Sequence, residues 1–197
     1  MKKIKVISFD ISPINKNFLM NEILNWSSNK KIARFICVSN VHSCIESFKN
    51  KKFKIAHNSS NLAVADGRPI FWALKLLGSK KAEHLPGYYI TESLCELAHK
   101  KKLSIGFYGS TNENINRIEF NLKKKFKQLR IEYKFSPPFR KLNLKEDKKI
   151  ISDINKSKID ILFVCLGCPK QELWMYEHRN KLKCTMLGIG AVADFLS

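Results

Sequence analysis

The residue types best suited to chemistry stand together after one apolar run of the chain. The run covers residues 159–166, and the block that follows it is Gly167, Cys168, Pro169, Lys170, Gln171 and Glu172. A buried parallel strand that ends in a Gly-Pro turn places a cation, an amide and a carboxylate at the carboxyl end of the strand. Open α/β sheets bind ligands at that edge. The block therefore predicts a ligand-binding turn.

A carboxylate stands in a second block, which follows the short apolar run 62–65. Asp66 is followed by Gly67, Arg68 and Pro69. Glycine relaxes the backbone and proline suits the first turn of a helix, so Asp66 is expected on an exposed strand-to-helix turn. There it can accept a proton from a hydroxyl or hold one; the alternative is a helix N-cap. Arg68 can grip a phosphate, or it is an ordinary surface charge.

Two further clusters follow predicted strands. Asn40, after the run 33–39, offers both a donor and an acceptor, and His42 can titrate near neutrality, although a single histidine is more often structural. The glycines of the second cluster, Gly188 and Gly190, let a ligand approach the backbone, and Asp194 follows them. This cluster lacks the third glycine of a dinucleotide-binding motif, so a nicotinamide cofactor is not expected.

Strands that end at a common edge would bring these clusters together. Apolar runs of strand length alternate with amphipathic stretches of helix length, which predicts an α/β, Rossmann-like fold with a mostly parallel sheet flanked by helices, as one domain over residues 1–197. The predicted strands are 5–10, 33–39, 62–65, 103–108, 131–135, 159–166 and 185–189. The predicted helices are 14–27, 41–50, 69–77, 91–101, 112–126, 144–156 and 170–182.

Composition limits the classes of protein to consider. The chain has 197 residues, is 44% hydrophobic and 27% charged, and contains no apolar stretch of membrane-span length. Its first ten residues are too short in their apolar part and too soon acidic for a signal peptide, so a cytoplasmic location is predicted. Cys165 and Cys168 form a C-x-x-C, but no second ligand pair follows at suitable spacing. We therefore expect no metal site.

The net charge is +19, and most of the excess is lysine. Three interpretations are compatible with it: a solvated lysine surface, attraction to an anionic membrane face, and binding to nucleic acid. Nucleic-acid readers rely on arginine forks, and this chain has few arginines and no recognisable nucleic-acid-binding motif. Nucleic acid is therefore not the expected partner.

The clusters together resemble a known family. The residues 38–42, Asp66-Gly67 before a helix that carries a tryptophan, Gly109 after a strand, the block 167–172 and the segment 188–195 are similar to the ordered motifs of the WecG/TagA/CpsF glycosyltransferases. The similarity runs from about Asn40 to Leu196. It implies an inverting transfer, without metal or cofactor, of an N-acetylmannosamine-type sugar from a UDP donor to a polyprenyl-diphosphate-linked N-acetylglucosamine. It also implies a location at the cytoplasmic face of the membrane in polysaccharide or cell-surface glycan synthesis.

The resemblance also assigns roles to residues. Asp66 matches the proposed general base of the family, which takes the proton of the acceptor hydroxyl. The residues that the resemblance and the motifs together predict to bind substrate are Asn40, Gly67, Arg68, Gly109, Gly167, Pro169, Lys170, Gln171, Glu172, Gly190 and Asp194. The resemblance leaves a homo-oligomer open.

Four departures from the family pattern are visible. Val38 stands where members often have threonine, His84 where many have arginine, and Tyr89 where they have aspartate. Members usually continue past Ser197 with a basic, aromatic tail, so we expect that tail to be absent and the lysine-rich surface to supply membrane contact. The alternative function is a non-catalytic module or partner subunit that binds a nucleotide-sugar.

Overall fold

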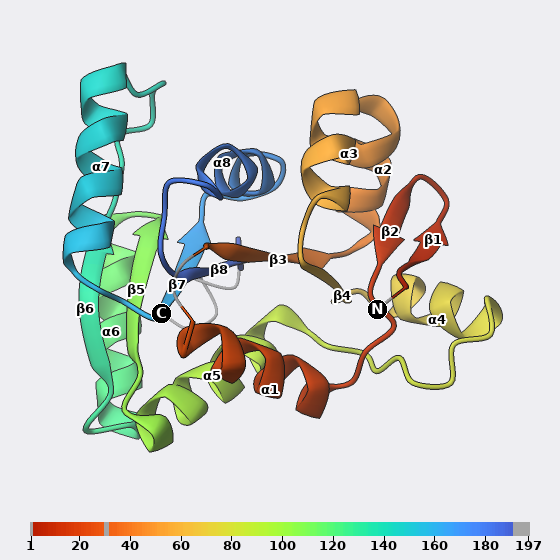
Figure 1. The fold of residues 1–197 in the computed structure, drawn as a ribbon, viewed down its shortest axis with the longest axis horizontal. Helices are drawn as coiled ribbons and strands as arrows, with labels where there is room; N and C mark the ends of the chain where they lie inside the picture. The colour runs from red at the N-terminus through yellow and green to blue at the C-terminus, as the bar shows by residue number, and fades with distance from the viewer. Residues whose placement is uncertain (1, 30–31, 191–197) are drawn as a thin grey trace.

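A parallel sheet forms the centre of the molecule, as the computed structural model shows for residues 2–29 and 32–190 (Figure 1). Its six strands lie in the order β4-β3-β8-β7-β5-β6, and every neighbouring pair is parallel. The strands are β3 (Arg34–Ser39), β4 (Leu62–Ala65), β5 (Ser104–Gly109), β6 (Arg130–Phe135), β7 (Ile161–Cys165) and β8 (Thr185–Gly188). The predicted α/β, Rossmann-like fold class is confirmed.

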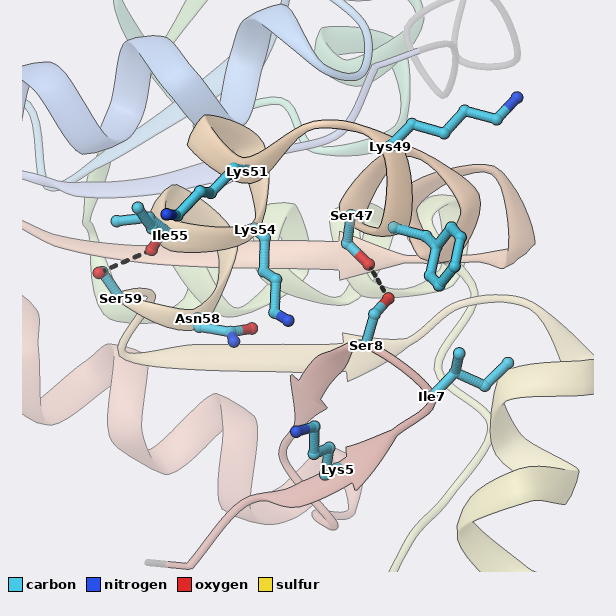
Figure 2. A pocket seen from close by; sticks show the side chains of 11 residues that line it. Lys5, Ile7, Ser8, Ser47, Lys49, Lys51, Lys54, Ile55, Asn58 and Ser59 are labelled. Carbon is cyan, nitrogen blue, oxygen red and sulfur yellow. Dashed lines mark hydrogen bonds between the residues drawn. The ribbon is translucent and has the colours of Figure 1, made fainter.

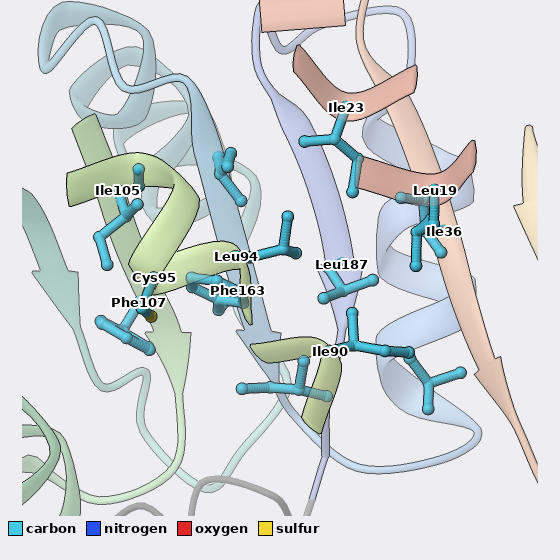
Figure 3. Close-up of a cluster of buried hydrophobic side chains, with 14 of the residues drawn as sticks. Leu19, Ile23, Ile36, Ile90, Leu94, Cys95, Ile105, Phe107, Phe163 and Leu187 are labelled. Carbon is cyan, nitrogen blue, oxygen red and sulfur yellow. The ribbon is translucent and has the colours of Figure 1, made fainter. Parts of the chain in front are cut away.

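Helices cover both faces of this sheet. They are α1 (Lys16–Ser27), α2 (Val41–Lys49), α3 (Lys51–Asn58), α4 (Arg68–Leu76), α5 (Gly87–Lys101), α6 (Asn112–Lys125), α7 (Leu144–Lys156) and α8 (Lys170–His178). Side chains of α1, α5 and α6 pack on one face in the cluster that Figure 3 shows, which includes Leu19, Leu94 and Phe163. Those of α2, α4, α7 and α8 join the cluster on the other face. Among the described residues, no helix is both long and apolar enough to cross a membrane.

The predicted strand 5–10 is wrong. The chain there forms a hairpin of β1 (Ile4–Val6) and β2 (Phe9–Ile11), which pair antiparallel outside the main sheet. The turn between them consists of Ile7 and Ser8, and Ile7 has a positive φ of 57°. Turns of this length favour glycine or asparagine at such a position. Because isoleucine gives no turn signal, the apolar pattern predicted one continuous strand through residue 7.

One helix was not predicted, and two helix ends were misplaced. α3 lies in a lysine-rich segment, where Asn50 ends α2 and its side chain caps α3 by accepting from the Phe53 N–H at 3.1 Å. The buried face of α3, with Phe53 and Ala56, is too narrow to stand out among the charges. α5 begins at Gly87, four residues before the predicted start, and α8 ends at His178 rather than residue 182. The other predicted elements agree with the structure within about two residues.

Candidate active site

A cavity of about 400 Å³ lies at the carboxyl edge of β3, β4, β7 and β8. Of the residues predicted to bind substrate or catalyse, it brings together Asn40, Asp66, Gly167, Gln171 and Gly190. These come from the segments that follow four of the strands, with Gln171 in the first turn of α8, as expected for a parallel sheet. The other lining residues are Val38, His42, Ser43, Gly87, Tyr88, Cys168, Gly188 and Ile189.

The Asp66 carboxylate is held in the cavity by two helix starts. Its Oδ1 accepts a hydrogen bond of 2.7 Å from the backbone N–H of Gly87, the first residue of α5. Its Oδ2 lies 3.5 Å from Nδ2 of Asn40, a weak contact. The helix that follows Asp66 has Gly67 as its N-cap and no side-chain cap, so the alternative that Asp66 caps that helix is wrong. One oxygen is therefore fixed, and the other can accept a proton.

Asn40 has a fixed orientation. Its side-chain Oδ1 accepts from the N–H and hydroxyl of Ser43, both at 3.2 Å, while Ser43 Oγ accepts from the Asn40 N–H at 2.9 Å. This reciprocal capping box begins α2. Because Oδ1 is used by the cap, the amide must present Nδ2, a donor, to Asp66. Asn40 thus steadies the second carboxylate oxygen.

Helix N-termini give the cavity an anion-binding character. First-turn or capping residues of α2, α5 and α8 line it, and helix N-termini carry partial positive charge and orphan N–H groups. None of the described residues that line it is a lysine or an arginine. In the described part of the cavity wall, stabilisation of a diphosphate would therefore come from backbone dipoles and His42.

A buried amide, which lines the cavity, and a buried acid behind it lie beside the glycines. Gln171 Nε2 donates to Glu172 Oε1 at 3.0 Å, and both side chains are almost fully buried. Burial raises the pKa of the Glu172 carboxyl, which favours its neutral form. Among the described residues, Gln171 Oε1 and Glu172 Oε2 are buried without a hydrogen-bond partner. Since Gln171 lines the cavity, its orphan oxygen is available to a donor group of a ligand.

Close packing fixes Gln171 in place. A Cβ at Gly188 would lie 3.1 Å from both Cδ and Nε2 of Gln171, and one at Gly190 would lie 3.4 Å from its Oε1. A side chain at position 188 would press on this amide and on Met175 Cε, 2.8 Å away, which is a structural reason for the first glycine of this pair. Gly190 has a positive φ of 49°. Both glycines therefore lie against the Gln171 amide that lines the cavity.

Several predicted residues lie outside the cavity lining. Gly109, at the end of β5, has a φ of 113°, and a Cβ there would be 2.6 Å from the Cys165 backbone, which is a structural reason for glycine. Arg68 and Lys170 are exposed at the starts of α4 and α8. Gly67, Pro169 and Glu172 adjoin lining residues without lining the cavity themselves. Asp194 lies outside the described residues. Their binding roles remain predictions.

Some lining residues had a weaker signal in the sequence. His42 is exposed at the start of α2 and lines the cavity, although its type alone favoured a structural role. Tyr88 lines it beside Gly87 and is 56% exposed. Cys168 contributes a thiol whose pKa is raised by burial and by the neighbouring Glu172. His84, in place of the arginine of the family pattern, donates from Nε2 to the Asp66 carbonyl at 2.5 Å.

Comparison with known proteins identifies the family of the chain. The model of the family described as "Glycosyl transferase WecG/TagA/CpsF family" matches residues 4–197. The chain belongs to the WecG/TagA/CpsF family. The predicted membership is therefore confirmed, and with it the class of enzyme, a glycosyltransferase.

Curated relatives in the WecG/TagA/CpsF family carry a specific name. A Bacillus spizizenii protein, named N-acetylglucosaminyldiphosphoundecaprenol N-acetyl-beta-D-mannosaminyltransferase, is 25% identical over 194 residues, which cover 94% of this chain and 74% of that protein. A Staphylococcus aureus protein of the same name is 28% identical over 134 residues, covering 68% of this chain. The latter match spans only 51% of the Staphylococcus protein.

Proposed function

We propose that this chain is an inverting glycosyltransferase that moves an N-acetylhexosamine, of the N-acetylmannosamine type, from a UDP-sugar to a polyprenyl-diphosphate-linked N-acetylglucosamine. The observation that carries the proposal is the Asp66 carboxylate in the strand-edge cavity, with Oδ1 bonded to the Gly87 N–H and Oδ2 left as the proton acceptor. The names of the Bacillus and Staphylococcus relatives support the sugar and the acceptor.

The proposed reaction is a single displacement. A hydroxyl of the acceptor sugar attacks the anomeric carbon of the donor, the new C–O bond forms as the bond to UDP breaks, and the electron pair leaves with UDP. Asp66 takes the hydroxyl proton, since a hydroxyl is a weak nucleophile without a base. The N-termini of α2 and α8 face the charge that develops on the diphosphate.

Gln171 suits recognition of the donor. Its buried Oε1 has no partner in the part of the chain that the structure describes, so it requires a hydrogen-bond donor. The N-acetyl N–H, a sugar hydroxyl and the uracil N–H each supply one. We propose that it binds one of these groups, with the enzyme acting at the cytoplasmic membrane face in polysaccharide or cell-surface glycan synthesis.

The test is release of UDP from a panel of UDP-N-acetylhexosamines, with and without a short-chain polyprenyl-diphosphate-N-acetylglucosamine. Transfer is expected from one donor epimer in preference to the others, and only when the acceptor is present. If donors bind but none is consumed with the acceptor present, the proposal fails and the alternative, a nucleotide-sugar-binding module, replaces it. If no donor binds at all, both are overturned.

A further inference from the structure

A second and larger cavity lies away from the candidate active site. It has a volume of about 810 Å³ and opens between the β1–β2 hairpin, the end of α2 and helix α3 (Figure 2). α2 connects it to the active-site cavity, because Asn40 at one end lines the first cavity and Lys49 at the other end lines the second. Nine helical residues separate these ends by about 13 Å along the axis.

The charged residues described in the wall of this cavity are all lysines. They are Lys5, Lys49, Lys51 and Lys54, and no aspartate or glutamate is among the described lining residues. None of these lysines forms an ion pair with a carboxylate of the described residues. Figure 2 shows Lys54 reaching into the space from α3 and Lys5 reaching in from the hairpin on the other side. The arrangement is built for an anionic surface.

Large apolar side chains stand exposed among these lysines. Ile7 is 76% exposed, Phe48 is 78% exposed and Ile55 is 48% exposed, and all three line the cavity. Ile7 also holds a left-handed backbone, with φ of 57°, which a β-branched residue adopts with strain. Glycine would suit the turn better. The hairpin turn thus combines a strained backbone with an exposed apolar side chain.

Charge and side-chain type decide between possible occupants. A second copy of the chain would bring one lysine-lined wall against another, which is repulsive. Single-stranded nucleic acid is bound by aromatic platforms and arginine, whereas two of the three exposed apolar residues here are isoleucines. Lysines beside aliphatic and phenylalanine side chains fit a bilayer interface, where the cations meet lipid phosphates and the apolar groups enter the acyl boundary.

We propose that this surface, the hairpin–α3 face, docks on a bilayer that contains anionic lipids. The face consists of Lys5, Ile7, Phe48, Lys49, Lys51, Lys54 and Ile55. The inference deepens the proposed function by assigning its membrane contact to a definite surface. Docking there would hold the active-site cavity one short helix away from the headgroups that surround a lipid-linked acceptor.

The test is flotation of the full chain with vesicles of phosphatidylcholine containing 30% phosphatidylglycerol (about a third anionic) at low and high salt. Lys51→Gln with Lys54→Gln is expected to weaken binding about 25-fold, since each cation near an anionic bilayer contributes about fivefold. The matched control is Lys124→Gln with Lys127→Gln, two exposed lysines in and just after α6, near the opposite edge of the sheet. This control carries the same net charge and should bind as the wild type.

Ile7→Gly tests the apolar part independently of charge. It should weaken vesicle binding while the melting temperature stays the same or rises, because the turn is relieved of strain. Any of three results would overturn the proposal. The two lysine pairs lose vesicle binding equally, or Lys51→Gln/Lys54→Gln binds vesicles as the wild type does. In the third, Lys51→Gln/Lys54→Gln loses binding to a single-stranded oligonucleotide but keeps its vesicle binding. The assay contains no sugar donor or acceptor, so a failure of the proposed transfer reaction leaves this result unaffected.

Discussion

Replacing Gly188 by alanine should separate the function of the Gln171 amide from the stability of the fold. The new Cβ would lie 2.8 Å from Met175 Cε and 3.1 Å from Gln171 Cδ and Nε2. Met175 is fully buried, so the side chains must shift within a packed core. Overpacking of this kind costs about 1–3 kcal/mol. For a chain of this size, that corresponds to a fall of about 2–12 °C in melting temperature.

The substitution should lower catalysis as well as stability. Relief of the 3.1 Å contacts requires Gln171 to move by a few tenths of an ångström, which strains its 3.0 Å bond to Glu172 and shifts Oε1. A misplacement of about 1 Å near reacting groups costs about 10²-fold in rate. For the smaller shift required here, we expect kcat/KM for the sugar donor to fall about 10-fold at a temperature where the variant is still folded. Donor titration by calorimetry would show whether binding falls with it.

Gly106→Ala is the matched control. Its Cβ would meet Ile159 Cδ1 at 2.8 Å and Tyr133 Cβ at 2.9 Å, a comparable clash in β5 and outside the cavity lining. Its melting temperature should fall by a similar amount while kcat/KM stays within about threefold of the wild type. The reasoning is refuted if both variants lose activity equally, or if Gly188→Ala keeps full activity.

Two other predictions concern stability. Burial lowers the pKa of His57 from 6.5 to about 3. Between these pH values the unfolded state binds a proton that the folded state does not. The free energy of unfolding should therefore fall as the pH drops from about 6.5 to about 3, by up to about 1.4 kcal/mol per pH unit. Urea titrations should show this slope in the wild type and a flatter one in His57→Gln; equal slopes would contradict the assignment. In Gly109→Ala the new Cβ would lie 2.6 Å from backbone atoms of Cys165, so the melting temperature should fall by more than about 10 °C. Gly78→Ala is the control, since Gly78 also has a positive φ, 87°, but its Cβ would have nothing within 4 Å. The control should lose only about 1–2 kcal/mol in the free energy of unfolding.

The common edge of the sheet was predictable from the sequence because parallel strands end on the same side. Asn40, Asp66 and Gln171 each follow an apolar run, and the structure places all three around one cavity. The pattern of apolar residues is enough for this step. The positions of the apolar runs predict which strand ends lie at the same edge, and the polar residues that follow those strands are then expected to be neighbours.

Other features depend on contacts that a linear pattern does not contain. The positions of Arg68 and Lys170 relative to the cavity were not predictable from charge alone: both are exposed first-turn residues outside its lining, and their binding roles remain predictions. The support of Gln171 by a buried, neutral-favouring Glu172 appears only once α8 packs on β8. The hairpin at Ile7 was missed because a strained residue occupies the turn. The missed turn is a place where tertiary packing overrides local preference.

The most direct test of the central claim is acceptor-dependent UDP release by Asp66→Asn, measured beside donor binding. Asparagine keeps the shape and an oxygen for the Gly87 N–H, but it cannot take a proton. Asp153→Asn, which alters an exposed carboxylate on α7 paired with Lys149, is the control. We predict that Asp66→Asn lowers turnover by about 10²–10⁴-fold with donor binding retained, while the control is unchanged. Turnover by Asp66→Asn within about threefold of the wild type would contradict the account, because Asp66 would then not be the base.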